Sequence, residues 1–247
     1  MTFDVYTLIK PGERDVNEDS VAVALGPSLT CYAVADGLGA HGGGDVASQT
    51  AVMAIEGLAR QPWEDSAAFL SCCFQEAQRA VMAKRIEHRH TMNMKTTLTA
   101  LVITAEFEAI WAHVGDSRLY RFPARRPWQW IRTQDHSVPQ AMCNAGTIRE
   151  KEIRFHPNRS SLLHALGMEG EDKQAAVCDA PVKLQPGDAF LLCSDGFWEW
   201  ITEGQMLLHL LKTKSTEEWV KAMERQILHK GSGKGMDNYS AIALKVR

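Results

Sequence analysis

Acidic residues stand beside glycine at the ends of three apolar, strand-like segments of this sequence. Along the chain, these pairs are Asp36-Gly37, Gly115-Asp116 and Asp195-Gly196. Two more acidic segments come directly before strand-like stretches: Asn17-Glu18-Asp19 before residues 21–25, and Asp237-Asn238 before residues 239–246. Five segments that are far apart in sequence can therefore bring carboxylates to one edge of a folded sheet.

Carboxylates gathered at the ends of buried strands repel one another and lose hydration unless positive charge lies between them. Oxygen ligands without clustered His or Cys suit hard cations such as Mg²⁺ or Mn²⁺ rather than zinc or copper. Five acidic segments exceed what one Mg²⁺ takes from a protein, because the ion keeps several waters. Taken singly, each Asp-Gly pair is typical of a turn. Their repetition favours a two-metal site.

The hydropathy pattern indicates which elements position these acids. Short runs rich in β-branched residues predict strands, and stripes of period 3.6 predict helices. Strands are expected at 3–9, 21–25, 29–35, 96–104, 108–115, 118–122, 175–182, 189–194 and 239–246, with those from 96 to 122 forming a meander. Helices are expected at 46–58, along a stripe from Phe69 to Val81, after Ser137, and at 162–166, 203–211 and 217–228. This order argues against a doubly wound parallel sheet and favours a layered α+β sandwich.

The composition is that of an ordinary globular protein of 247 residues, with 45% hydrophobic and 23% charged residues. The formal net charge of −3 gives no field that would hold a polyanion, so a general nucleic-acid or membrane-surface binder is disfavoured. We find no signal peptide or long apolar span, and we expect a cytoplasmic location. The six cysteines have no C-x-x-C spacing, which indicates reduced core residues.

Ordered motifs along the chain resemble those of the metal-dependent protein phosphatases, the type 2C serine/threonine family, in their compact bacterial form. The first is Arg14-x-x-Asn17-Glu18-Asp19-Ser20, followed by VADGLGAHGGGDVAS at 34–48 and Thr96-Thr97-Leu98. HVGDSRLYR begins at His113, QDHSVPQAMCNAGTI at Gln134 and LLCSDGFWEWIT at Leu191, and Asp237-Asn238 completes the series.

The resemblance implies a four-layer α-β-β-α sandwich, with two central antiparallel sheets flanked by helices and two Mn²⁺ or Mg²⁺ ions at one end. Residues 1–247 would form a single catalytic domain with a flap insertion at about 134–170. The metal ligands it implies are Glu18, Asp19, Asp36, Gly37, Asp116, Asp195 and Asp237, with Asp116 serving a weaker third ion. Asp36, Asp195 and Arg14 would be the catalytic residues, and Arg14 would also bind the substrate phosphate.

The implied mechanism is attack on phosphorus by a hydroxide that bridges two cations about 4 Å apart, which lower the pKa of the bridging water. The planar guanidinium of Arg14 would bind the negatively charged phosphoryl oxygens. Leu38 stands where many eukaryotic relatives have a histidine proposed as general acid. Metal-bound water would then protonate the leaving oxygen.

A cysteine-dependent phosphatase is one alternative, because Cys73 and Cys143 each precede an arginine, Arg79 and Arg149, by six positions. That chemistry needs a thiolate in a glycine-rich cradle at a helix N-terminus. Cys73 falls within a predicted helix, and CNAGTIR has one glycine, so the sequence disfavours a thiol mechanism.

We therefore expect a metal-dependent hydrolase acting on phosphoserine and phosphothreonine in proteins, in signal transduction that counteracts a Ser/Thr kinase. Phosphorylated proteins would be its partners, without nucleic acid or membrane, and it would act as a monomer. The alternative from another class is a catalytically weak pseudophosphatase that binds phosphoproteins. Retention of every acidic ligand position favours catalysis.

Overall fold

The computed structural model describes residues 1–39, 42–87, 94–169, 176–177 and 180–247. Its strands are β1 (Phe3–Lys10), β2 (Asp19–Leu25), β3 (Leu29–Leu38), β4 (Lys95–Thr96), β5 (Leu98–Thr104), β6 (Glu108–Val114), β7 (Arg118–Phe122), β8 (Ile131–Arg132), β9 (Ala176–Val177), β10 (Val182–Lys183), β11 (Ala189–Cys193) and β12 (Tyr239–Val246). Its helices are α1 (Gly44–Ala59), α2 (Ser66–Glu87), α3 (Val138–Asn144), α4 (Glu150–Ile153), α5 (Asp195–Trp198), α6 (Glu203–Lys212) and α7 (Thr216–Gly231).

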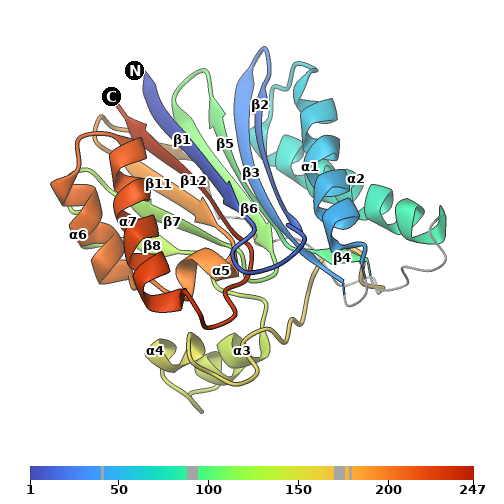
Figure 1. The fold of residues 1–247 in the computed structure, drawn as a ribbon. Coiled ribbons are helices and arrows are strands. Elements are labelled where there is room, and N and C mark those ends of the chain that lie inside the picture. Colours follow the sequence, from blue (N-terminus) through green and yellow to red (C-terminus); the bar gives the residue numbers. More distant parts are fainter. Residues whose placement is uncertain (40–41, 88–93, 170–175, 178–179) are drawn as a thin grey trace.

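Within the described residues, the strands form two antiparallel sheets that pack face to face. The first sheet has the order β1-β12-β11-β7-β8, so β12 lies between β1 and β11. The second has the order β10-β6-β5-β3-β2, with β4 paired to β3 and β9 paired to β6. Figure 1 shows α6 and α7 over the outer face of the first sheet and α1 and α2 over that of the second. The four-layer α-β-β-α sandwich expected from the resemblance is confirmed.

Alternation along the strands builds the core between the sheets. In β3, Tyr32 and Val34 face the first sheet, whereas Cys31, Ala33 and Ala35 face α1 and α2. The same period of two recurs in β11 and β12, where the larger side chains fill the space between the sheets. Small residues toward the helices let α1 approach the sheet closely.

The outer cores come from helix stripes of the predicted period. On α1 the residues Ala47, Ala51 and Ile55 are fully buried against the second sheet. On α7, Trp219 and Met223 are fully buried against the first sheet. These helices agree with the sequence expectation.

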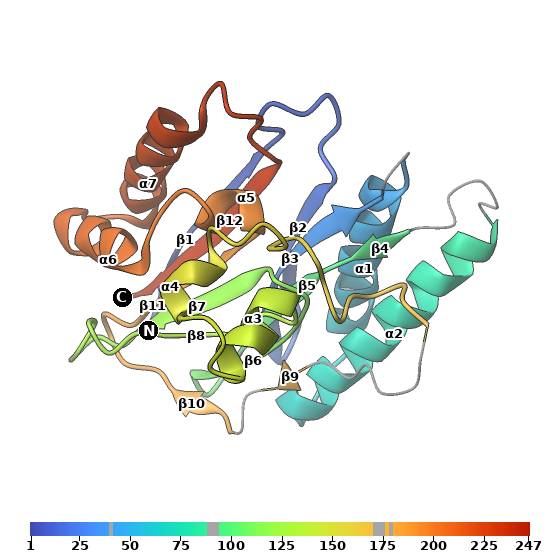
Figure 2. The ribbon, with the colours of Figure 1, turned by 90° about the horizontal axis from the view of Figure 1, so that it is seen from below.

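The segment from 134 to 169 contains α3 and α4 and projects below the sheets in Figure 1, so that it lies in front of them when the molecule is seen from below (Figure 2). The helix expected at 162–166 was wrong. Leu162 forms an isolated β-bridge with Ser137, and Leu166 forms one with Thr96. The first bridge joins two parts of the segment to each other, and the second fastens its C-terminal end to β4. The backbone groups of both leucines are therefore used in strand-like pairing rather than in a helix.

Two strand expectations also need correction. The meander expected from 96 to 122 is wrong at β7, because β5 and β6 pair in the second sheet whereas β7 pairs with β11 in the first. Both faces of β6 and β7 are buried, so hydropathy does not indicate where the chain changes sheet. The expected strand at 175–182 is represented by β9 and β10, while residues 175 and 178–179 lie outside the described part.

The described cysteines are free: Cys31, Cys73 and Cys193 are buried, and Cys72 and Cys143 are partly exposed. Burial raises the pKa of the Cys73 thiol, which opposes its ionisation. Cys143 lies inside α3 rather than at a helix N-terminus. The structure therefore gives no support to a thiol mechanism, and Cys178 lies outside the described residues. No helix in the described part is long and apolar enough to cross a membrane.

Candidate metal centre and active site

Asp19 and Asp36 lie directly opposite each other on neighbouring antiparallel strands, in the register of β2 with β3. Like charges in this position destabilise a sheet. Asp19 is only 4% exposed, and burial together with nearby carboxylates, including Asp237 and Glu18, raises its pKa to about 7. The sheet therefore places two acids where neither can ionise at low cost without a cation.

Backbone contacts fix the position of Asp36. Its N–H donates to Thr97 Oγ1 at 3.0 Å, and its carbonyl accepts from Thr96 Oγ1 and Thr97 N–H at 2.9 Å each. The next residue must be glycine, because a Cβ on Gly37 would overlap the carbonyl oxygens of Gly44 and Glu18. The Thr-Thr pair of the sequence motif thus orients the acid.

Glu18 enters the site through Asn238. The Glu18 N–H donates to Asn238 Oδ1 at 2.7 Å, and Asn238 Nδ2 donates to the carbonyls of Pro11 and Val16 at 2.8 and 3.0 Å. The residue that precedes β12 therefore fastens the N-terminal motif to the site. Burial and the nearby Asp45 raise the pKa of the Glu18 carboxyl.

Asp195 begins α5, directly after β11. Its pKa is raised well above the usual value. The largest cause is burial, followed by the charges of Asp116, Glu199, Asp237 and Asp19. Asp36 behaves likewise, with burial followed by Asp195 as the largest causes. The preceding Ser194 hydroxyl donates to Asp19 Oδ2 at 2.7 Å. The two sheets thus meet at this cluster of acids.

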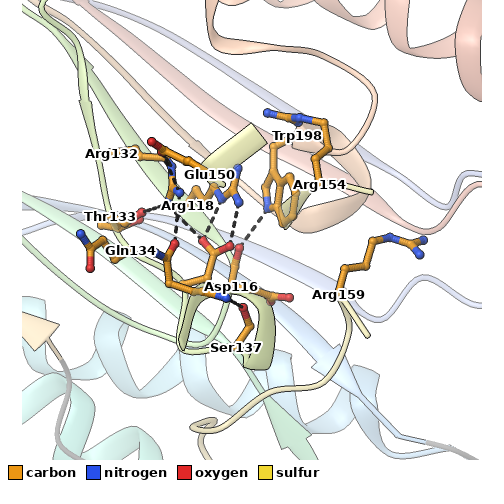
Figure 3. Close-up of polar contacts among 12 residues, drawn as sticks. Asp116, Arg118, Arg132, Thr133, Gln134, Ser137, Glu150, Arg154, Arg159 and Trp198 are labelled. Atoms are coloured by element: carbon orange, nitrogen blue, oxygen red, sulfur yellow. Dashed lines mark hydrogen bonds and ion pairs between the residues drawn. The ribbon is translucent and has the colours of Figure 1, made fainter. Parts of the chain in front are cut away.

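Asp116 occupies the turn between β6 and β7 and is 4% exposed. Burial and the neighbouring Asp135 raise its pKa to about 7. Its carbonyl accepts from Trp198 Nε1 at 2.9 Å (Figure 3), and the Gly115 carbonyl accepts from His136 N–H at 2.9 Å. The flap segment and α5 therefore both hold the turn that carries Asp116.

Asp237 and Arg14 contact each other. Arg14 Nη2 lies 2.9 Å from Asp237 Oδ2, and Arg14 Nε donates to Oδ1 at 3.1 Å. The expected phosphate-binding residue thus holds an expected metal ligand. Among the described residues, no group of three or more His, Cys, Asp or Glu side chains is set to hold an ion as it stands. Strand register brings the acids close together, and each acid feels the charge of the others.

A cavity of about 630 Å³ opens over this cluster. Its lining includes these expected site residues: Arg14, Glu18, Asp36, Gly37, Asp195 and Asp237. Asp19 and Asp116 are buried outside that lining. Sequence reasoning missed Asp45 and Ser160, which also line it. The GGGD segment could have indicated Asp45, because an acid is favoured in the first turn of a helix. Nothing in the sequence around Ser160 marks it.

The residues present fit hard divalent cations. Every donor in the cluster is an oxygen, and Asp19 Oδ1 is buried without a hydrogen-bond partner among the described residues. Repulsion among Asp19, Asp36 and Asp195 is the kind that a cation relieves. The arrangement can therefore bind anionic substrates only after cations have reversed its negative charge.

Comparison with known proteins decides the family. The family model described as "Protein phosphatase 2C" matches residues 12–231. The chain belongs to the protein phosphatase 2C family. It is 33% identical over 192 residues to the serine/threonine phosphatase stp of Listeria innocua, a match that covers 74% of this chain and 72% of the relative. It is 30% identical over 234 residues to PstP of Mycobacterium tuberculosis, covering 94% of this chain and 43% of that protein.

Solved structures of protein phosphatases agree with the family assignment. The crystal structure of M. tuberculosis PstP/Ppp has a TM-score of 0.85 and 28% identity, with full coverage of both chains. The PstP catalytic domain in complex with 2 manganese ions has a TM-score of 0.83 and 26% identity, covering 99% of each chain. The expected family, fold and enzyme class are confirmed, and the expectation of paired ions agrees with the manganese complex. The relatives named here are phosphatases, and they do not favour the pseudophosphatase alternative.

Proposed function

We propose that this chain is a metal-dependent serine/threonine protein phosphatase with its catalytic centre at the acidic cavity. The observation that carries the proposal is the register of β2 with β3, which places Asp19 opposite Asp36. The proposed ligands of two Mn²⁺ or Mg²⁺ ions, and of a weaker third ion, are Glu18, Asp19, Asp36, Gly37, Asp116, Asp195 and Asp237. When bound, the ions activate water for attack on the phosphoester.

Arg14 binds the substrate phosphate in this proposal. Its guanidinium is 56% exposed beside the cavity and is fixed by Asp237. A planar fork can hold two phosphoryl oxygens at once. Asp237 and a phosphate would use the same donors, so Arg14 would bind the substrate phosphate with the donors that Asp237 gives up if it holds a metal ion.

The leaving seryl or threonyl oxygen needs a proton. The apolar side chain of Leu38 lines the cavity, and the lining that the structure describes contains no histidine. The proton therefore comes from solvent in the cavity rather than from an imidazole at this position.

Residues 1–247 form one catalytic domain in this proposal, and the segment at 134–170 is a flap that tunes substrate access. Ser160 supports the flap role, since it lines the cavity from within that segment. Replacing the flap should change selectivity among phosphopeptides more than turnover of a small aryl phosphate. Unchanged selectivity would contradict this role.

The proposed partners are phosphorylated proteins, the targets of a Ser/Thr kinase, and the chain acts as a cytoplasmic monomer in signal transduction. The net charge of −3 supports the exclusion of nucleic acids and anionic membranes as partners.

Phosphate release from a phosphoserine peptide, with Mn²⁺ and with EDTA, tests the catalytic proposal. We expect turnover with Mn²⁺ that EDTA abolishes. A folded chain that binds the phosphopeptide but releases no phosphate with Mn²⁺ would be a pseudophosphatase instead.

A further inference from the structure

A second cavity, of about 400 Å³, lies between the flap and the first sheet. Five basic side chains line it: Arg118, Arg132, Arg149, Lys151 and Arg154. It shares none of its described lining residues with the cavity of the metal centre. Figure 3 shows the buried arginines with their partners beside Asp116. The proposed phosphatase reaction does not use this cluster.

Arg118 forms the fixed inner wall of this cavity. Its side chain is 2% exposed, and its Nε and Nη2 donate to the two carboxylate oxygens of Asp135 at 2.8 and 2.7 Å. The guanidinium carbon also lies 3.5 Å from the centre of the Trp198 ring. Asp135 therefore neutralises Arg118, and the charge available to a ligand comes from the other basic residues.

Arg154 has a donor that no described residue accepts from. Its side chain is 8% exposed, and Nη2 donates to Glu203 Oε1 at 2.7 Å. Nη1 is buried and has no hydrogen-bond partner among the described residues. A buried donor of a charged group is costly when it lacks an acceptor, and such groups are normally paired. This nitrogen is a donor that an acceptor bound beside Arg154 would satisfy.

Arg132 has a partner that can leave. Its side chain is 6% exposed, and its Nη2 lies 3.0 Å from Glu150 Oε1. The Glu150 side chain is 63% exposed and comes from the short helix α4. An exposed carboxylate loses little interaction free energy when it leaves its partner and returns to water. Arg132 Nη1 also donates to the Thr133 carbonyl at 2.6 Å, and Nη2 donates to Gln140 Oε1 at 3.1 Å. An incoming anion can therefore replace Glu150 at Nε and Nη2 of Arg132, while these other contacts hold the guanidinium in place.

The charge balance around the cavity favours a ligand with two negative charges. The five basic residues are opposed by Glu150 and Glu203 in the lining, by Asp135 behind Arg118, and by Glu152, which pairs with Arg149. One positive charge remains while Glu150 stays in place, and two remain once it leaves. Guanidinium forks suit tetrahedral phosphate oxygens, and the exposed Lys151 adds charge at the rim.

We propose that this cavity is a second anion site that binds a phosphate monoester or inorganic phosphate through Arg132 and Arg154, with Lys151 at its rim. The phosphate can come from two sources: the inorganic product of the reaction, or a second phosphorylated residue of a substrate protein. Trp198 separates the site from the metal centre, since the same ring stacks on Arg118 and donates to the Asp116 carbonyl.

Calorimetric titration of the full chain in Mg²⁺ with inorganic phosphate tests the site. Lys151→Glu should weaken one binding component about threefold or more, and Glu150→Gln should strengthen the same component by a similar factor. Arg154→Gln should weaken it about tenfold. Lys212→Glu, an equal charge change at an exposed position of α6, should leave it unchanged.

The variant Arg14→Gln separates this proposal from the catalytic one. It should weaken phosphate binding in the metal cavity and leave the component that responds to Lys151→Glu intact. The proposal is overturned if Lys151→Glu and Glu150→Gln both bind phosphate like the parent chain. These two exposed substitutions decide the question even if Arg154→Gln fails to fold.

A phosphoserine peptide titrated into the Asp36→Asn chain distinguishes the two sources. Binding that weakens in a Lys151→Glu background would assign the site to phosphorylated protein segments. Phosphate binding without peptide binding at this site would assign it to the free product. Absence of both would refute the site.

Discussion

Asp36 is held by three backbone hydrogen bonds, and its carboxyl is surrounded by other acids. We expect Asp36→Asn to lower metal-dependent turnover by about 10³-fold or more, because charge stabilisation of several kcal/mol is lost. Phosphate release from a phosphopeptide in Mn²⁺ measures the effect. Cys143→Ser is the matched control and should keep parent activity, so a large loss there would contradict the metal mechanism.

A substitution at Gly37 tests whether the backbone segments at the site must lie as close together as the structure shows. Gly37→Ala should destabilise the fold by about 2 kcal/mol or more, since its Cβ would overlap the Gly44 and Glu18 carbonyls. Gly57→Ala is the control within α1, where nothing lies within 4 Å of an added Cβ. That change should raise stability by about 0.5–1 kcal/mol. Urea denaturation of both variants checks the prediction, and similar losses would contradict it.

At the scale of single residues, the acidic site residues could be predicted from the sequence, but the residues that contact them could not. Asp36 and Asp195 could be found because each follows an apolar run of sequence, although Asp36 lies inside β3, which continues to Leu38. The Arg14–Asp237 pair joins residues 223 positions apart. Asn238 fastens the N-terminal motif through hydrogen bonds to the carbonyls of Pro11 and Val16. Local pattern does not encode such long-range contacts.

Among the elements, the flap is attached through histidine rings, one pair stacked and the other edge-on. The ring of His136 lies 4.6 Å from that of His113 and 5.3 Å from that of His164. Burial, followed by the charges of His113 and His164, lowers the pKa of His136 to about 4, and Asp135 opposes these effects. The flap is therefore fastened by a neutral imidazole.

This attachment gives a pH dependence with a definite sign. In the unfolded chain His136 takes up a proton below about pH 6.5, whereas in the folded protein it does so only near pH 4. The free energy of unfolding should therefore fall as pH drops through this window. His136→Phe should reduce that fall, measured by urea denaturation at pH 7 and pH 5. Identical pH dependence in both chains would contradict the assignment.

Helices and strands with one buried face could be predicted from periodicity, as α1 and α7 show. The change of sheet between β6 and β7 could not, because both strands are buried on both faces. The helix expected at 162–166 failed for another reason: Leu162 and Leu166 use their backbone groups in bridges to distant residues. Tertiary pairing overrode the local preference.

At the scale of the whole molecule, cations and protons compete for the same acids. Mn²⁺ should raise the stability of the fold by about 2.7 kcal/mol when its concentration is 100 times its Kd. Because the pKa values of Asp19 and Asp116 are raised to about 7, ion binding must displace protons below that pH. The increase in Tm with Mn²⁺ should therefore be larger at pH 8 than at pH 6. Scanning calorimetry measures it, and a larger shift at pH 6 would contradict the scheme.

The place of β12 has a consequence for synthesis on the ribosome. This strand lies between β1 and β11, and its eight residues pair with β1 from Phe3↔Val246 to Lys10↔Tyr239. A nascent chain that still lacks residues 237–246 has neither Asp237 nor the strand that joins the two halves of its first sheet. Hydrolysis of phosphoproteins must then wait until translation has passed this point, so an unfinished polypeptide lacks the acidic centre that the reaction needs.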